Sequence, residues 1–107
     1  MSRFTDFVDS LKDPAGVLVK DELKKLVRDG KADLSDFVRR QAGQLETLTV
    51  MLAQGELTPE GYRKLVRRME VLGELEALKL TVAAKASAQR LAAGIEEIVV
   101  GALFRLI

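Results

Sequence analysis

Residues 80–107 read LTVAAKASAQRLAAGIEEIVVGALFRLI, and they place the strongest constraint on this 107-residue chain. Eighteen of these 28 residues are apolar, and helical spacing spreads them around the helix instead of along one stripe. A helix that is apolar on nearly all sides has to be buried on nearly all sides. The helices expected before it offer one stripe each, so we predict that a second copy of the chain completes the burial.

The sequence before this tail predicts three shorter helices and no strand. Apolar residues recur there at helical spacing, whereas alternation rich in β-branched residues is missing. We expect the second helix to begin with Asp13 as the cap of Pro14 and to end at Gly30. The third helix is expected to be capped by Asp33 and to end at Gly55.

The fourth helix is expected to begin at Pro59, after the capping residue Thr58. As one unbroken helix, residues 59–106 would be roughly 72 Å long, whereas a globule of this chain length is roughly 35 Å across. The helix therefore has to break, near residues 87–89 or at a glycine, or project into a neighbouring subunit.

These patterns predict an all-α protein: a helical bundle of three shorter helices and a long or broken C-terminal helix, assembled as an oligomer. The length suits a single domain over residues 1–107. Within it we expect N-terminal helices in residues 1–57 and an oligomerisation helix in residues 58–107.

A series of mostly small residues recurs along the C-terminal segment at seven-residue steps, at Gly73, Leu80, Ser87, Gly94 and Gly101. Glycine inside a helix costs about 1 kcal/mol relative to alanine, so such a seam suits the close approach of another helix. The alternative is that Gly94 and Gly101 mark breaks between shorter helices. We predict a two-fold dimer interface that contains Leu80, Ala84, Ser87, Leu91, Gly94, Ile95, Ile98, Gly101 and Ala102.

Residues 45–72 contain a leucine-spaced helix, a glycine turn and a second helix that begins with Leu-Thr and carries an aromatic residue. The residues concerned are Leu45, Leu48, Leu52, Gly55, Glu56, Leu57, Thr58, Tyr62, Leu65 and Met69. This pattern resembles the SHOCT family of short helix-turn-helix modules, and it departs from that family at Gly61, where a second acidic residue is usual. The resemblance implies oligomerisation without catalysis.

Composition limits the chemistry that the chain can perform. Histidine, cysteine and tryptophan are absent, which excludes imidazole bases, thiol nucleophiles, disulfides and the usual zinc or copper sites. Glu70 and Glu74 share a helix face without the histidine that a carboxylate-bridged iron site needs. Glu96 and Glu97 diverge from each other, and a salt bridge across an interface is the role we expect of them. We expect no enzymatic activity, no cofactor and no bound metal.

Two other classes of function stay open. Arg63, Lys64, Arg67 and Arg68 form a basic cluster that could contact a polyanion such as nucleic acid, although Glu60 at the start of the same helix would repel phosphate. A solvated helix face is the simpler interpretation, since the net charge is only +1. The apolar C-terminal helix could instead dock on a membrane surface.

The function we expect is a non-enzymatic, self-associating helical assembly or adaptor module. Its partners would be a second copy of itself, most simply in a dimer, and another protein. The sequence begins without the apolar core of a signal peptide, and charges interrupt its apolar tail. We therefore expect a cytoplasmic protein.

Overall fold

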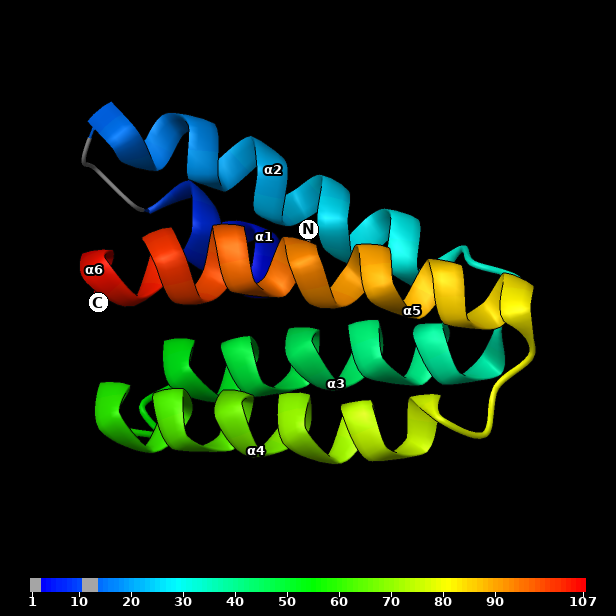
Figure 1. Ribbon diagram of the computed structural model, residues 1–107. Coiled ribbons are helices and arrows are strands. Elements are labelled where there is room, and N and C mark those ends of the chain that lie inside the picture. The colour runs from blue at the N-terminus through cyan, green and yellow to red at the C-terminus, as the bar shows by residue number, and fades with distance from the viewer. Residues whose placement is uncertain (1–2, 11–13) are drawn as a thin grey trace.

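The computed structural model describes residues 3–10 and 14–107, and the regular elements in these ranges are all helices. The helices are α1 (Arg3–Asp9), α2 (Pro14–Lys31), α3 (Asp36–Ala53), α4 (Pro59–Ala77) and α5 (Val82–Gly94). A π-helical stretch, η1 (Ile95–Leu103), and the short α6 (Phe104–Leu106) continue α5, and Figure 1 shows these three as one rod. The predicted all-α class is confirmed.

Helix α3 lies at the centre of the bundle, because it packs against α1, α2, α4 and α5. In Figure 1, α3 and α4 form an antiparallel hairpin, the α5–η1–α6 rod runs beside it, and α2 crosses the opposite side of the rod. The molecule measures 40 × 24 × 24 Å. Helix α4 is an outer layer, since its main neighbours are α3 and, to a lesser extent, α5.

The large apolar side chains of the C-terminal rod pack in or against the core of a single copy of the chain, so the expectation that their burial requires a second copy is not met. Leu91, Ile95, Val99 and Leu103 belong to one core with α1, α2, α3 and α4. In residues 80–107, Val82 is the one large apolar side chain that is exposed. The sequence count of apolar residues included seven alanines, four of which lie on the solvent side of the rod. An exposed alanine methyl group adds little apolar surface, so the apolar area of the rod that has to be buried is smaller than the count of apolar residues indicates.

The π-helical stretch explains how the large side chains of the rod share one face. Leu91, Ile95, Val99 and Leu103 follow one another at steps of four residues. In an α-helix each such step overshoots a full turn by about 40°, so the apolar stripe would rotate away from the core. The wider turn of a π-helix brings each fourth residue closer to the same direction. All four side chains are less than a tenth exposed.

The long helix breaks between Ala77 and Val82, and not near residues 87–89 or at a glycine. Helix α4 ends at Ala77, and Thr81 caps α5 by accepting a hydrogen bond from Ala84 N at 3.3 Å. Gly94 has helical backbone angles, with φ −64°, and a Cβ there would lie 2.5 Å from Leu26 Cδ1. The glycine therefore serves close packing, as one of the two alternatives predicted, but against α2 of the same chain.

The glycine turn before α4 was predicted correctly, whereas the turn before α3 was not. Gly55 adopts φ +77°, and Thr58 accepts a hydrogen bond from Gly61 N at 3.0 Å. Gly30, in contrast, lies inside α2, and the cap of α3 is Ser35. Asp33 instead accepts a hydrogen bond from Ser35 N at 2.9 Å. The expected cap at Asp13 lies outside the described residues.

Candidate functional site

Most of the large apolar side chains that are exposed in the described residues lie on the outer face of α4 or just beyond its end. Tyr62, Val66, Met69 and Gly73 turn the inner face of this helix toward the core. The opposite face carries large apolar side chains that stay in solvent and continue past the end of the helix. These residues, which we call the α4 stripe, are Val71, Leu72, Leu75, Leu78 and Val82, between 51% and 86% exposed. Exposed large apolar side chains gathered on one side of a helix are typical of interaction sites.

Cations lie in the first half of α4 and carboxylates in the second half, which is the order that the helix dipole disfavours. Residues 59–68 contain four cations and one carboxylate, whereas residues 69–77 contain three carboxylates and no cation. A helix dipole favours carboxylates near the N-terminus and cations near the C-terminus. Ion pairs within the helix offset little of this, since Lys64–Glu60, at 3.4 Å, joins two side chains that are about three-quarters exposed.

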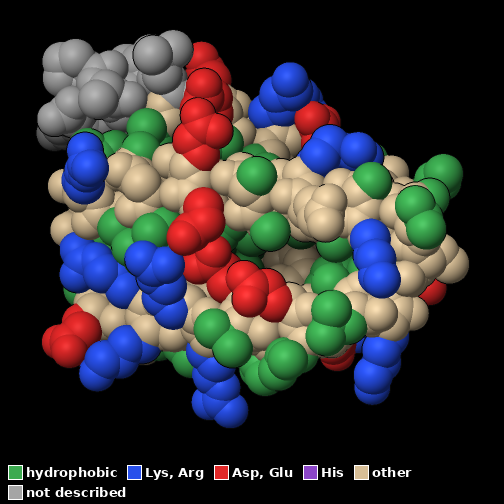
Figure 2. All heavy atoms as spheres, in the orientation of Figure 1, with side chains coloured by type: hydrophobic (Ala, Val, Ile, Leu, Met, Phe, Trp, Pro, Cys, Tyr) green, Lys and Arg blue, Asp and Glu red, His purple; other side chains and the backbone are tan. Residues whose placement is uncertain are grey.

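A groove lies between α4 and the rod, with α3 as its floor. It has a volume of about 520 Å³. Figure 2 shows it as a hollow with carboxylates beside it and apolar side chains around its rim. The apolar lining comes from Phe37, Ala77, Leu78, Ala88, Leu91, Ala92, Ala93 and Ile95, and the polar lining from Gln41, Glu70, Glu74, Lys85, Gln89 and Glu96. We call this feature the α4–α5 groove.

Gly73 of α4 makes room for one of the polar side chains of the groove. A Cβ at this position would lie 2.7 Å from Gln41 Nε2. The absence of a side chain therefore lets α3 present an amide between α4 and the rod. The seven-residue spacing had suggested that Gly73 serves contact with another helix, and the structure assigns that contact to α3 of the same chain.

Glu70 is the residue of the groove with the most perturbed ionisation. Its side chain is 13% exposed, and its Oε1 atom is buried without a hydrogen bond. Arg67 Nη1 lies 4.0 Å from Glu70 Oε1 and 3.3 Å from Glu96 Oε1. Burial, and then the neighbouring carboxylate of Glu96, raise the pKa of Glu70 to about 7, against a smaller opposing effect of Arg67.

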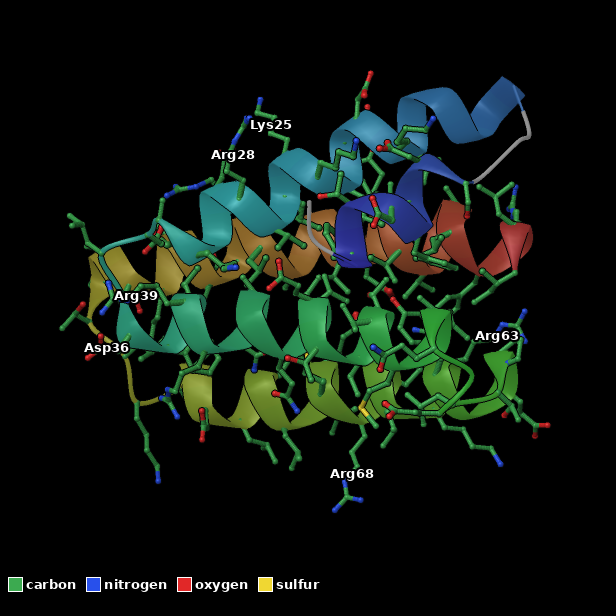
Figure 3. The ribbon with its side chains drawn as sticks, turned by 180° about the vertical axis from the view of Figure 1, so that it is seen from behind. Lys25, Arg28, Asp36, Arg39, Arg63 and Arg68 are labelled. Atoms are coloured by element: carbon green, nitrogen blue, oxygen red, sulfur yellow. The ribbon has the colours of Figure 1, made fainter. Side chains whose placement is uncertain are left out.

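The structure disperses the predicted basic cluster among separate contacts. Arg63 Nη2 donates hydrogen bonds to the backbone carbonyls of Phe104 at 3.0 Å and Ile107 at 3.1 Å, and so fastens the C-terminal turn to α4. Lys64 pairs with Glu60, and Arg67 with the carboxylates of the groove. Figure 3 shows Arg68 pointing away from the bundle, well separated from Arg63.

The nine residues predicted for the dimer interface do not form a free surface. Leu91 and Ile95 are buried, and Leu80, Ile98 and Ala102 pack against the same core. Gly101 is exposed, and the partly buried residues are Ala84, Ser87 and Gly94. The α4 stripe was missed, although its signal is present in the sequence: the apolar residues of α4 recur at helical spacing on two opposite faces.

Comparison of the chain with protein-family models, with curated proteins and with solved structures gives no match. Among the described residues, no set of three or more carboxylates is arranged to hold a metal ion. None of the helices in the described ranges has the length and apolar character that crossing a membrane requires.

Proposed function

We propose that the protein is a non-enzymatic assembly or adaptor module, and that it associates with a second copy of itself through the α4 stripe. The observation that carries this proposal is the exposure of five large apolar side chains, three on the outer face of α4, Leu78 at its C-terminal end and Val82 at the start of α5. Full burial of such a side chain stabilises by about 1.5–3 kcal/mol. Even partial burial of five of them in each copy favours association over exposure to water.

The order of charges along α4 supports a two-fold, antiparallel contact. A two-fold axis pairs the same surface of both copies, and it places the helices antiparallel when they cross the axis side by side. The basic first half of one α4 then lies beside the acidic second half of the other. Within one α4 the order of charges is unfavourable for the helix dipole. Between two antiparallel copies the same order is favourable, because charges of opposite sign meet along the rim of an apolar contact.

Two alternative functions have less support. A polyanion would compete with the carbonyls and carboxylates that contact Arg63, Lys64 and Arg67. A membrane surface would need the large side chains of the rod, and these side chains contribute to the core of the monomer. The α4 stripe, in contrast, is available without any change in the fold.

Size-exclusion chromatography with light scattering tests the proposal. We expect the wild-type protein to have the mass of two chains at micromolar concentration. Leu75→Glu places a carboxylate in the middle of the α4 stripe and should give a folded monomer. Ala86→Glu adds the same charge at an exposed position of α5 outside the stripe, and should leave the dimer intact. A monomeric wild type, or a dimeric Leu75→Glu variant, would overturn the proposal.

A further inference from the structure

We propose that the α4–α5 groove binds an organic cation, with an ammonium group beside Glu70 and an apolar body between α4 and the rod. This site shares only Leu78 with the α4 stripe; the rest of its lining lies on the flank of α4 that faces the rod, on α3 and on the rod, whereas Val71, Leu72 and Leu75 lie on the outer face of α4. The two proposals can therefore fail independently.

The shape of the groove suits a small organic ligand. Its volume of about 520 Å³ lies within the range of roughly 300–1,000 Å³ that is usual for such sites. Phe37 and Leu91 contribute large apolar side chains to the lining, whereas Ala77, Ala88 and Ala92 leave the space open. An apolar body in contact with these residues would be withdrawn from water, which is the main source of affinity in pockets of this kind.

The charged residues that line the groove indicate that its ligand carries a positive charge. Glu70, Glu74 and Glu96 line it, and Arg67 is the cation that contacts Glu70 and Glu96. Lys85 also lines the groove, but it belongs to the first turns of α5, whereas Glu96 follows the end of that helix. The part of α3 in the lining, Phe37 and Gln41, is neutral. The end of the groove near Glu70 and Glu96 therefore carries excess negative charge.

The neighbouring carboxylates of Glu70 and Glu96 indicate where the charge of the ligand would lie. A buried carboxylate is costly unless it is paired and hydrogen-bonded. Glu70 Oε1 has no hydrogen bond, and the guanidinium of Arg67 is shared with Glu96. A proton held between the two carboxylates removes this cost at low pH. At higher pH an ammonium group in the groove would offset the negative charge of Glu70 and Glu96 from the accessible side of the two carboxylates.

The ligand is expected to be organic and not a bare metal ion. The carboxylates of the described residues are not arranged as a metal-binding set, and apolar side chains make up most of the lining. Metal ions such as calcium and magnesium need several oxygen ligands around them. An alkylammonium ion needs one carboxylate for its charge and an apolar surface for its chain, and the groove supplies both.

Titration of the protein with octylammonium, octanol and octanoate, followed by nuclear magnetic resonance of the backbone amides, tests the site. At pH 8 we expect octylammonium to shift the amide signals of Gly73, Ala77 and Leu91, and octanoate to leave them unchanged. Glu70→Gln should weaken octylammonium binding about tenfold, as expected for the loss of one partly buried charge pair. Glu76→Gln removes a carboxylate from the same helix outside the groove and should bind as the wild type does.

Further variants separate a specific site from general adhesion to apolar surface. Ala92→Phe fills the groove from an exposed position of α5 and should abolish the shifts without disturbing the core. Leu75→Glu should retain them, because Leu75 does not line the groove. Octanol binding as tightly as octylammonium, Glu70→Gln binding as the wild type, or shifts confined to Val71, Leu72 and Leu75 would each overturn the proposal.

Discussion

Glu70 makes the stability of the protein depend on pH in a predictable direction. The pKa of this carboxyl rises from 4.5 to about 7 on folding, mainly because of burial and the nearby Glu96. Below pH 4.5 it is protonated in both the folded and the unfolded state and costs nothing. As the pH rises toward 7, the unfolded chain loses this proton before the folded chain does, so the free energy of unfolding decreases.

Glu70→Gln should remove this dependence. We expect the variant to be more stable than the wild type by about 1–2 kcal/mol at pH 8, a discounted value because solvent screens the partly open groove. The two proteins should differ little at pH 4. Urea unfolding at both pH values measures the difference, and Glu76→Gln, at an exposed carboxylate, is the control. Equal pH dependence in Glu70→Gln and the wild type would contradict the assignment.

Thr49 and Tyr62 form a buried hydrogen-bond chain whose direction is fixed. The hydroxyl of Thr49 donates its proton to the carbonyl of Leu45 at 2.8 Å. The hydroxyl of Tyr62, 2.8 Å from Thr49 Oγ1, therefore has to be the donor in the bond between the two side chains. Burial raises the pKa of Tyr62 from 10.0 to about 12, so the hydroxyl stays protonated even in moderately alkaline solution.

Removing the acceptor should therefore destabilise the protein more than removing the donor. Thr49→Val leaves the hydroxyl of Tyr62 buried without a partner and should cost about 2–3 kcal/mol. Tyr62→Phe leaves Thr49 bonded to Leu45 and should cost about 1 kcal/mol. Chemical denaturation of both variants gives the comparison. If Tyr62→Phe lowered the free energy of unfolding more than Thr49→Val does, the assignment of Tyr62 as the donor to Thr49 would be contradicted.

At the level of helices, glycines decide how closely α2 and α3 approach. A Cβ on Gly30 would lie 2.6 Å from the Cβ of Ala42, an atom that cannot move without its helix. Gly30→Ala should destabilise the protein by about 1–3 kcal/mol, despite the higher helix propensity of alanine. Gly43, in α3, has no atom within 4 Å of a Cβ built there, so Gly43→Ala should stabilise by up to about 1 kcal/mol. Thermal unfolding that ranks the two variants in the opposite order would refute this packing.

The same glycines show which parts of the fold the sequence could reveal. Gly55 stops a helix because the chain needs a positive φ there, and local signals around Thr58 and Pro59 agree with it. Gly30 looks identical in sequence, but its helix continues to Lys31 because Ala42 of α3 packs on it. That contact joins residues far apart in the chain. Local patterns therefore predict caps and turns, but they do not show which glycines are packing positions.

The two candidate surfaces were not predicted from the sequence either, because they depend on tertiary packing. The one local signal of the break between α4 and α5 is the threonine cap at Thr81, which lies within a largely apolar segment. Once the rod folds back, its large side chains meet α2 and α3, and the outer face of α4 is left uncovered. The α4–α5 groove exists only because of this fold-back, since its lining comes from three helices. Its carboxylates were visible in the sequence, but their proximity was not.

At the scale of the whole molecule, the net charge of +1 leaves two copies nearly free of mutual repulsion at long range. The local order of charges on α4 then decides how the copies align. If α4 pairs antiparallel with its counterpart, Arg68→Glu places a carboxylate beside the acidic half of the other helix and should weaken the dimer about tenfold. Glu76→Arg should weaken it similarly.

Combining the two substitutions separates an antiparallel contact from other arrangements. In the antiparallel dimer, the double variant restores opposite charges on facing segments and should recover most of the affinity that each single variant loses. In a parallel dimer each charge faces its own equivalent, so the double variant would repel at both positions and recover nothing. Sedimentation equilibrium of the four proteins measures the coupling, and high salt should reduce it because these side chains lie in solvent.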